Sequence, residues 1–327
     1  MKTNILQAKK ALLALFAMLM PLLASAQTKV EIDGIWYNLT PKKVKQAEVT
    51  YKDSNYLTYG AYSGSINIPA TVTYEDVTYS VTSIGDYAFY WCKSLTDITI
   101  PESVTSIGEN AFSSSSKLTA ITIPENSQLT SIGEYAFRDC YNLTSIDIPD
   151  GGAWIREGTF WGCSSLTTIT IPEGVTYIAD HAFRNCYSLR SITLPASVHY
   201  IGGYAFDWCY NLTTINIPEG VTRVEIGTFR QCSSLKSITL PASVEYLDDM
   251  AFARSGLKEI TSLATEAPGL GIAVFDGLND VKINHLTGSN FSTWKAALAP
   301  KADVNGDGEV DVADITAVIK TIKEREQ

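Results

Sequence analysis

Hydrophobic residues recur along most of this chain at a fixed interval of 23 residues. The clearest repeated position is a phenylalanine, which occurs at Phe89, Phe112, Phe137, Phe160, Phe183, Phe206, Phe229 and Phe252, with Phe275 in a degenerate copy. One interval, from Phe112 to Phe137, is 25 residues long because extra residues lie within Pro124–Leu129. Self-similarity at a period of this length predicts a repeat architecture.

Each repeat contains alternating patterns that predict two short extended segments and a compact arc. In one regular copy, apolar and polar residues alternate along Leu189–Leu194, and Pro195 then ends the predicted strand. Val198–Ile201 predicts a second short extended segment, after which the chain turns at a glycine. Ala205–Cys209 then predicts a short helical or irregular arc that packs back inside.

A single repeat of this kind cannot bury its own apolar face, but stacked repeats can, at about 4.8 Å between neighbouring strands. Separate hairpin domains are the main alternative, but they do not explain a phenylalanine at constant spacing. We therefore predict a solenoid over residues 81–283, built from short β-strands with short helical or irregular arcs.

The repeated motif Ile-x-Ile-Pro-x-x-Val-x-x-Ile-Gly-x-x-Ala-Phe-x-x-Cys-x-x-Leu extends from about residue 66 to residue 283. It resembles the bacterial surface leucine-rich repeats of the BspA-like class. Thr159 and Thr228 replace the alanine of this motif, and Ser115 and Ser255 replace its cysteine. The resemblance implies a leucine-rich-repeat solenoid and a secreted or surface-displayed binding protein, and some relatives act as adhesins for host proteins.

Both ends of a solenoid require caps. Residues 27–80 alternate β-branched, tyrosine and polar positions, which predicts a β-rich N-terminal cap with a hairpin at Val72–Tyr79. Residues 284–300 predict a C-terminal cap, with a short helix over Asn290–Leu298 and Trp294 packed inward.

Residues 1–26 have the pattern of a secretory signal peptide, with basic residues, the apolar run Ala11–Leu23 and an Ala-x-Ala cleavage site. A membrane anchor is the alternative, but this run is too short to span a bilayer. We therefore expect a secreted or cell-surface protein whose mature chain has no transmembrane segment. The formal net charge of −10, which becomes −13 without the three lysines of this segment, argues against nucleic acid as a partner.

The six cysteines follow the same interval as the repeats. They are Cys92, Cys140, Cys163, Cys186, Cys209 and Cys232. We predict buried free thiols that act as small apolar residues, because side chains in a stacked column point in parallel. One or two disulfides between adjacent repeats are the alternative. A single file of thiolates does not provide the tetrahedral ligands of a metal site.

The segment 301–327 carries one chemically specific motif. Six residues lie at the offsets of a calcium-binding loop: Asp303, Asn305, Asp307, Glu309 through its carbonyl, Asp311 and Asp314. Gly308 supplies the sharp turn that such a loop needs. We therefore predict Ca²⁺ as a cofactor. Asp314, in the last ligand position, has a shorter reach than the usual glutamate.

An amphipathic helix is predicted directly after this loop. Its apolar stripe consists of Ile315, Val318, Ile319 and Ile322. The loop and helix resemble one half of a dockerin, and this resemblance implies a cohesin-like partner. Only one half is present, and Val312 and Ala313 replace the usual Ser/Thr pair, so self-association through the stripe is an alternative.

Exposed aromatic residues are the candidate ligand contacts. Trp154, Tyr177 and Tyr200 occupy one position on three consecutive repeats. Further candidates near the cysteine position are Tyr187, Trp208 and Tyr210. The alternative is that these rings stack between repeats and only stabilise the solenoid.

Catalysis has little support in the sequence. The only histidines are His181, His199 and His285, none of them lies in a metalloprotease, hydrolase or nucleotide motif, and we expect the first two to be surface residues. We expect a non-enzymatic, adhesin-like protein that binds an extracellular protein or glycan. The alternative is a scaffold or accessory component of an extracellular polysaccharide-degrading assembly, tethered through the dockerin-like segment.

Overall fold

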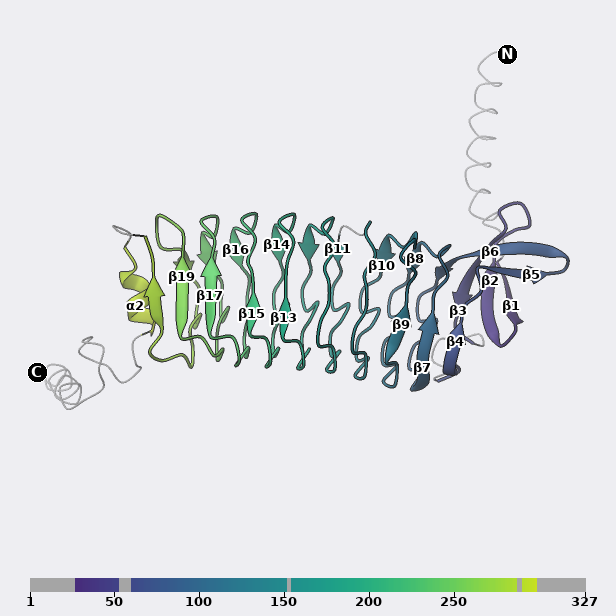
Figure 1. Cartoon of the computed structure of the whole chain (residues 1–327), viewed down its shortest axis with the longest axis horizontal. Coiled ribbons are helices and arrows are strands. Elements are labelled where there is room, and N and C mark those ends of the chain that lie inside the picture. Colours follow the sequence, from purple (N-terminus) through teal and green to yellow (C-terminus); the bar gives the residue numbers. More distant parts are fainter. Residues whose placement is uncertain (1–26, 53–59, 152–153, 287–289, 299–327) are drawn as a thin grey trace, which may run out of the picture.

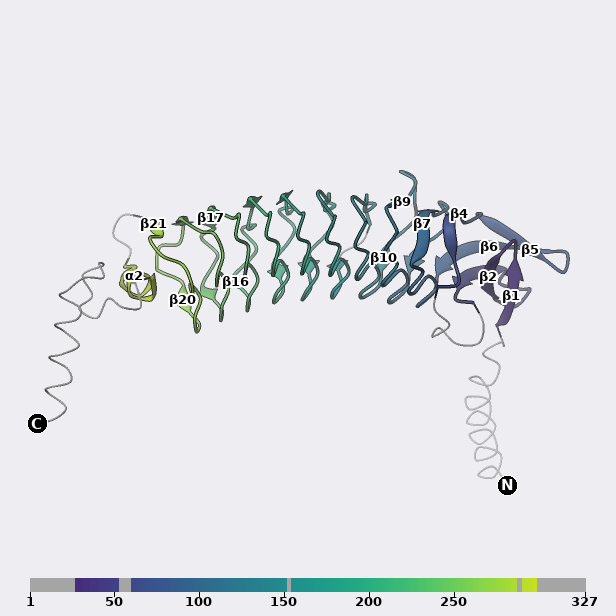
Figure 2. The same cartoon turned by 90° about the horizontal axis from the view of Figure 1, so that it is seen from below.

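The computed structural model of the chain describes residues 27–52, 60–151, 154–286 and 290–298. It shows an elongated solenoid in which the repeats follow one another along a single axis (Figure 1). We call one 23-residue repeat a rung. The strands form two rows along the solenoid, and the same arrangement is seen from below in Figure 2. The repeat solenoid predicted from the sequence is thus confirmed.

The first row is formed by the Leu-x-x-Ile-x-Ile/Leu part of the repeat. Its strands are β4 (Ser63–Asn67), β7 (Ser94–Thr99), β9 (Ala120–Thr122), β13 (Ser191–Ile192), β15 (Thr214–Ile215), β17 (Ser237–Leu240), β19 (Glu259–Ser262) and β21 (Lys282–Asn284). They pair in parallel as β4–β7–β9, β13–β15 and β17–β19–β21. A single bridge from Asp147 to Thr170 continues the row between the first two of these sheets.

The second row is formed by the Val-x-x-Ile part of the repeat. Its strands are β6 (Val77–Ile84), β8 (Ser106–Ile107), β10 (Ser131–Ile132), β11 (Trp154–Ile155), β12 (Tyr177–Ile178), β14 (Tyr200–Ile201), β16 (Arg223–Val224), β18 (Tyr246–Leu247) and β20 (Gly269–Leu270). They pair in parallel as β6–β8–β10, β11–β12–β14 and β16–β18–β20. Paired residues occupy the same position of the repeat, so each position of the repeat becomes a column in space.

The 25-residue interval leaves this register intact. Ser106 pairs with Ser131, its equivalent in the next rung, although 25 positions separate them. The extra residues form a turn in which the N–H of Ser127 donates to the carbonyl of Pro124. The insertion therefore bulges out of the stack without moving the columns.

At the N-terminal end, β1 (Thr28–Ile32), β2 (Ile35–Leu39) and β3 (Gln46–Thr50) pair antiparallel, and β3 joins β6 in parallel. The predicted hairpin forms between β5 (Thr71–Tyr74) and β6. Parallel pairing in the first row already begins at β4, before residue 81, the expected start of the solenoid. The hairpin lies inside the first rung and separates its two strands, β4 and β6.

The core of the solenoid is the phenylalanine column. The rings from Phe89 to Phe252 are fully buried, and each stacks on the next with centroids 5.0 to 5.7 Å apart and planes within 13° of parallel. Stacked aromatic rings add stability beyond the apolar area that they bury. The in-register strands and this column therefore reinforce each other along the whole stack.

Two other aromatic residues close the ends of the column. Tyr62 packs on Phe89 at 4.8 Å, and its hydroxyl donates to the carbonyl of Thr50 at 2.8 Å. At the other end the predicted helix forms as α2 (Ser292–Leu298), and its buried Trp294 packs on Phe275 at 5.5 Å. Within the described residues, no helix has the length and apolar character needed to cross a membrane.

A second inner column is formed by the six cysteines, all of which are free and buried, as predicted. From Cys140 to Cys232, each thiol donates a hydrogen bond to the phenylalanine carbonyl of the preceding rung, at 3.1 to 3.2 Å. Ser115 makes the equivalent bond with its hydroxyl at 2.7 Å. The expectation that these residues are merely small and apolar is thus incomplete, because the column also links successive rungs.

We predict that Phe183→Ala lowers the free energy of unfolding by about 3–5 kcal/mol, because it leaves a cavity between two stacked rings. Urea unfolding of the full chain, followed by circular dichroism, measures this change. Thr193→Ala, at an exposed position of the next rung, is the control and should change the stability by less than about 0.5 kcal/mol. Similar small effects of both substitutions would contradict the proposed role of the column.

We predict that the native chain reacts slowly with a thiol reagent at about pH 8, because the thiolate is the reactive species. Burial raises the pKa of the Cys92 thiol to about 11 and raises the pKa values of the other five thiols as well. Unfolding in denaturant without a reductant should expose all six thiols. If only two or four thiols react in the unfolded chain, disulfides bridge the rungs.

Candidate functional site

The outward column of the second strand row brings together three predicted contact residues. In these two-residue strands the second residue is buried, as Ile155 and Ile178 are, so the first faces outward. Trp154 pairs with Tyr177, and Tyr177 pairs with Tyr200. The three aromatic side chains therefore lie on consecutive rungs, and their role as ligand contacts stays a prediction.

The three rings differ in how much of their surface is already in contact with neighbouring side chains. The rings of Tyr177 and Tyr200 stack on each other at 4.3 Å with planes 9° apart, which matches the alternative of stacking between repeats. Trp154 is 54% exposed, and the Arg156 guanidinium lies 5.3 Å from the centre of its ring. Among the ring pairs of the described residues, none includes Trp154. The indole is thus the most accessible of the three rings.

A groove of about 540 Å³ lies beside this column. Trp154 and Tyr177 line it, together with Glu134, Arg156, Glu157, Ala179, Asp180 and His199. These residues come from four consecutive rungs, so the groove extends along the stack. It combines aromatic rings with carboxylates, and both kinds of group are typical of recognition sites.

The carboxylates of the groove belong to one column that sequence inspection missed. Glu134, Glu157 and Asp180 each lie three residues before a phenylalanine of the core, and Asp86 and Glu109 occupy the same position on the two preceding rungs. The signal was therefore present as an acidic residue at one position of five consecutive repeats. The Tyr135 hydroxyl donates to Glu157, and the Gly203 N–H donates to Asp180 at 2.9 Å.

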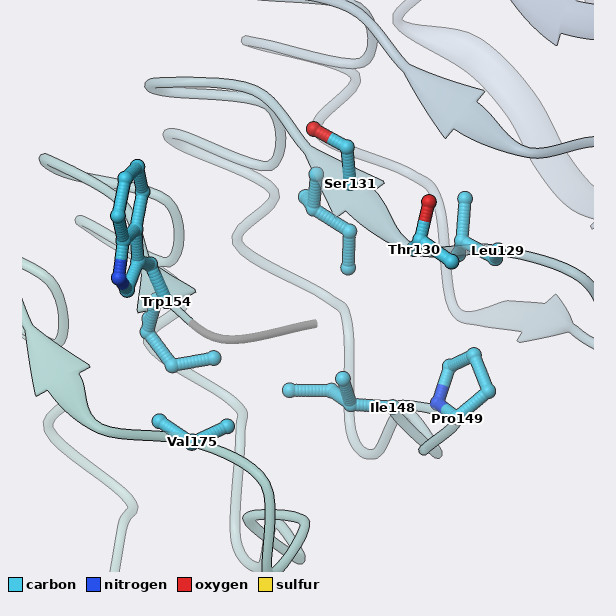
Figure 3. Close-up of a pocket in the computed structure, with 9 residues that line it drawn as sticks. Leu129, Thr130, Ser131, Ile148, Pro149, Trp154 and Val175 are labelled. Atoms are coloured by element: carbon cyan, nitrogen blue, oxygen red, sulfur yellow. The ribbon is translucent and has the colours of Figure 1, made fainter. Parts of the chain in front are cut away.

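A smaller hollow, also bordered by Trp154, lies between β10 and β11 (Figure 3). Ser131, Ile148 and Val175 are among the residues that line it, and its volume is about 20 Å³. A space of this size holds about one water molecule. It is therefore too small for a ligand, and the larger groove is the candidate site.

The other three predicted contact residues form a separate group. The rings of Tyr187 and Tyr210 stack at 5.4 Å with planes 20° apart, and Trp208 packs against Tyr210 at 5.3 Å. None of the three lines the groove. The structure thus divides the six candidate aromatic residues into two groups, and the first group borders the groove.

A buried ion cluster was not predicted. Asp207 is fully buried, and its carboxylate contacts Arg184 at 3.2 Å and Arg230 at 2.9 Å, one from each neighbouring rung. Burial raises the pKa of Asp207, whereas the hydrogen bond from Arg230 acts to lower this pKa. The cluster therefore links three consecutive rungs, and removing one arginine would leave the buried carboxylate less well compensated.

The histidines occupy different surroundings. His181 is half-buried between Trp161 and Tyr204, at 5.1 and 5.4 Å, and burial together with Arg184 lowers its pKa. His199 is exposed, as expected, and it lines the groove, whereas His181 is less exposed than we expected. The predicted calcium ligands, at positions 303–314, and the apolar stripe that follows them lie outside the described residues.

Comparison with known proteins identifies the repeat. A family model described as "BspA type Leucine rich repeat region (6 copies)" matches residues 55–163, 82–212 and 153–279. A leucine rich cell surface protein from Faecalibacterium prausnitzii has a similar solved structure, with a TM-score of 0.50 and 24% identity over 84% of this chain and 98% of that chain. A leucine-rich repeat protein from Bacteroides ovatus has a TM-score of 0.55 and 29% identity over 78% of this chain and 67% of that chain. None of the curated proteins matches this chain.

The matches to the family model overlap and together extend from residue 55 to residue 279, which is more than two thirds of the chain. They cover the rungs that hold the phenylalanine and cysteine columns, the groove and both aromatic groups. The solved structures share this fold. The chain therefore belongs to the BspA-type leucine-rich repeat family.

Proposed function

We propose that this chain is a non-enzymatic, adhesin-like binding protein that recognises an extracellular protein or glycan through its solenoid. The observation that carries this proposal is the groove beside the exposed indole of Trp154. Aromatic side chains supply large contact areas at little cost in conformational entropy and are enriched among the residues that dominate binding.

Export to the cell surface or medium is part of the proposal. The signal pattern at residues 1–26 supports it, although that segment lies outside the described residues. The similar structure from Faecalibacterium prausnitzii is that of a leucine rich cell surface protein. A surface or secreted location gives the groove access to extracellular ligands.

The arrangement of the carboxylates supports binding over hydrolysis. Glycosidases place two carboxyl groups on opposite sides of the bond that they cleave. Glu134, Glu157 and Asp180 instead follow one another in a single column on consecutive rungs. This geometry suits contacts along a ligand rather than attack across one bond.

We predict that Trp154→Ser, Tyr177→Ser and Tyr200→Ser together weaken ligand capture at least about 30-fold, which corresponds to the loss of one dominant contact. Binding of the full chain to an array of purified extracellular matrix proteins and glycans measures this effect. Circular dichroism should show an intact solenoid, since all three side chains face outward.

The second aromatic group provides a matched variant for this test. Tyr187→Ser, Trp208→Ser and Tyr210→Ser remove three rings outside the groove and should leave capture unchanged. Capture that survives the groove variant but disappears in this second variant would transfer the site to the other group and contradict the proposal.

A second function is favoured by the calcium motif at residues 303–314. We propose that the segment 301–327 binds Ca²⁺ and tethers the chain as a scaffold or accessory component of an extracellular polysaccharide-degrading assembly. The partner is a cohesin-like domain or a second copy of the chain, bound through Ile315, Val318, Ile319 and Ile322. Oxygen ligands at these offsets converge on one hard cation.

We predict that calorimetric titration of the full chain shows one Ca²⁺ bound per molecule, and that Asp303→Asn with Asp307→Asn abolishes this binding. Asp147→Asn with Asp150→Asn removes the same charge from exposed positions of the solenoid and should leave the titration unchanged. Sedimentation with and without Ca²⁺, alone and with a cohesin-type domain, identifies the partner. A titration without heat from calcium binding would remove this second function.

A further inference from the structure

Several carboxylates of the solenoid pair with a cation, whereas the carboxylates that line the groove do not. Elsewhere, ion pairs join Asp139 to Arg138, Asp207 to Arg184 and Arg230, Asp276 to Arg254 and Glu259 to Lys282. Among the ion pairs of the described residues, none includes Glu134, Glu157 or Asp180. These three acidic groups therefore line the groove without an ion-pair partner.

Elsewhere in the same stack, an arginine of the chain itself lies between an aromatic ring and carboxylates. Arg223 occupies the outward column between Tyr200 and Tyr246, and its guanidinium lies 4.5 Å from the centre of the Tyr246 ring. The same guanidinium pairs with Asp248 at 2.7 Å and with Glu225 at 3.4 Å. A cation held between an aromatic face and carboxylates is thus an arrangement that this repeat geometry accommodates.

The groove presents the same two kinds of group, aromatic faces and carboxylates. Its part of the outward column contains no arginine equivalent to Arg223. Trp154 and Tyr177 supply the aromatic faces, and the three carboxylates follow one another at about 4.8 Å per rung. Arg156 is the only arginine or lysine that lines the groove, and its guanidinium lies over the indole rather than in an ion pair with these carboxylates. The formal charge of the lining lysine, arginine and acidic side chains is therefore negative.

We propose that the groove binds lysine or arginine side chains of an extended basic segment in a protein partner. This inference rests on the proposed binding function and names the chemistry of the ligand. Carboxylates attract the cation, and the rings of Trp154 and Tyr177 stabilise it through cation–π contacts. A neutral glycan also stacks on aromatic rings, and its hydroxyls can donate hydrogen bonds to carboxylates. It supplies no positive charge to offset the net negative charge of the lining, so charge complementarity favours the basic peptide.

The test uses the full chain and a fluorescein-labelled octa-lysine peptide, with octa-glutamate and a neutral oligosaccharide as comparison probes. Fluorescence anisotropy should show binding of octa-lysine alone. Raising the salt from about 50 mM to about 500 mM should weaken this binding, since exposed charges are screened. Trp154→Ser should weaken it about threefold, as the loss of one exposed cation–π contact predicts.

Two triple variants with the same net charge separate groove binding from general attraction to an acidic protein. Glu134→Gln, Glu157→Gln and Asp180→Asn should weaken octa-lysine binding at least about tenfold. Glu173→Gln, Glu219→Gln and Glu245→Gln remove three exposed carboxylates outside the groove and should leave binding within about twofold of the original chain.

Equal weakening by both triple variants, or no binding of octa-lysine, would overturn this inference. Capture of the neutral oligosaccharide that depends on Trp154 but not on the three carboxylates would also overturn it, while leaving the proposed binding function intact. Failure of the proposed function itself has a different signature, because array ligands would then remain bound after the three outward aromatic residues are replaced by serine.

Discussion

Parallel pairing of equivalent residues, one rung above another, is the constraint on which the rest of this structure depends. It places each phenylalanine ring directly over the next, at 5.0 to 5.7 Å from Phe89 to Phe252. The cysteine column has the same register, and its thiols donate hydrogen bonds to the phenylalanine carbonyls of the preceding rungs. Because each rung contacts only its neighbours, the fold is stabilised locally, and Tyr62 and Trp294 close the ends of the core.

The outward columns determine what such a molecule can bind, because the repeat does not constrain which side chains occupy these positions. One such column changes from serine at positions 83, 106 and 131 to Trp154, Tyr177 and Tyr200, and then to Arg223. The neighbouring acidic column overlaps these aromatic residues only at some rungs. The groove forms where both are present, so a local combination of residues on a uniform scaffold gives the solenoid one distinctive surface.

Much of the fold could be predicted from the sequence, because a repeat imposes the same environment on each copy. The solenoid, the inward phenylalanine and cysteine columns, the hairpin and the helix that carries Trp294 all follow from spacing and alternation. The contacts between particular rungs could not be predicted, since the repeat places side chains in columns but does not determine which atoms of neighbouring rungs meet. Asp207 with its two arginines is one example, and the thiol hydrogen bonds are another. The acidic column was visible in the sequence, but only the structure places it beside Trp154 in a groove.

Distances between spin labels test the in-register stack most directly. Labels on cysteines introduced at exposed positions of equivalent columns, such as Thr144, Arg190 and Lys236, avoid the buried native thiols. Pulsed electron resonance on Thr144→Cys with Lys236→Cys should give a mean separation of about 19 Å, four rungs at about 4.8 Å each. Thr119→Cys with Lys236→Cys, one rung further apart, should give about 24 Å. Separations that do not increase by one strand spacing per rung would contradict the account.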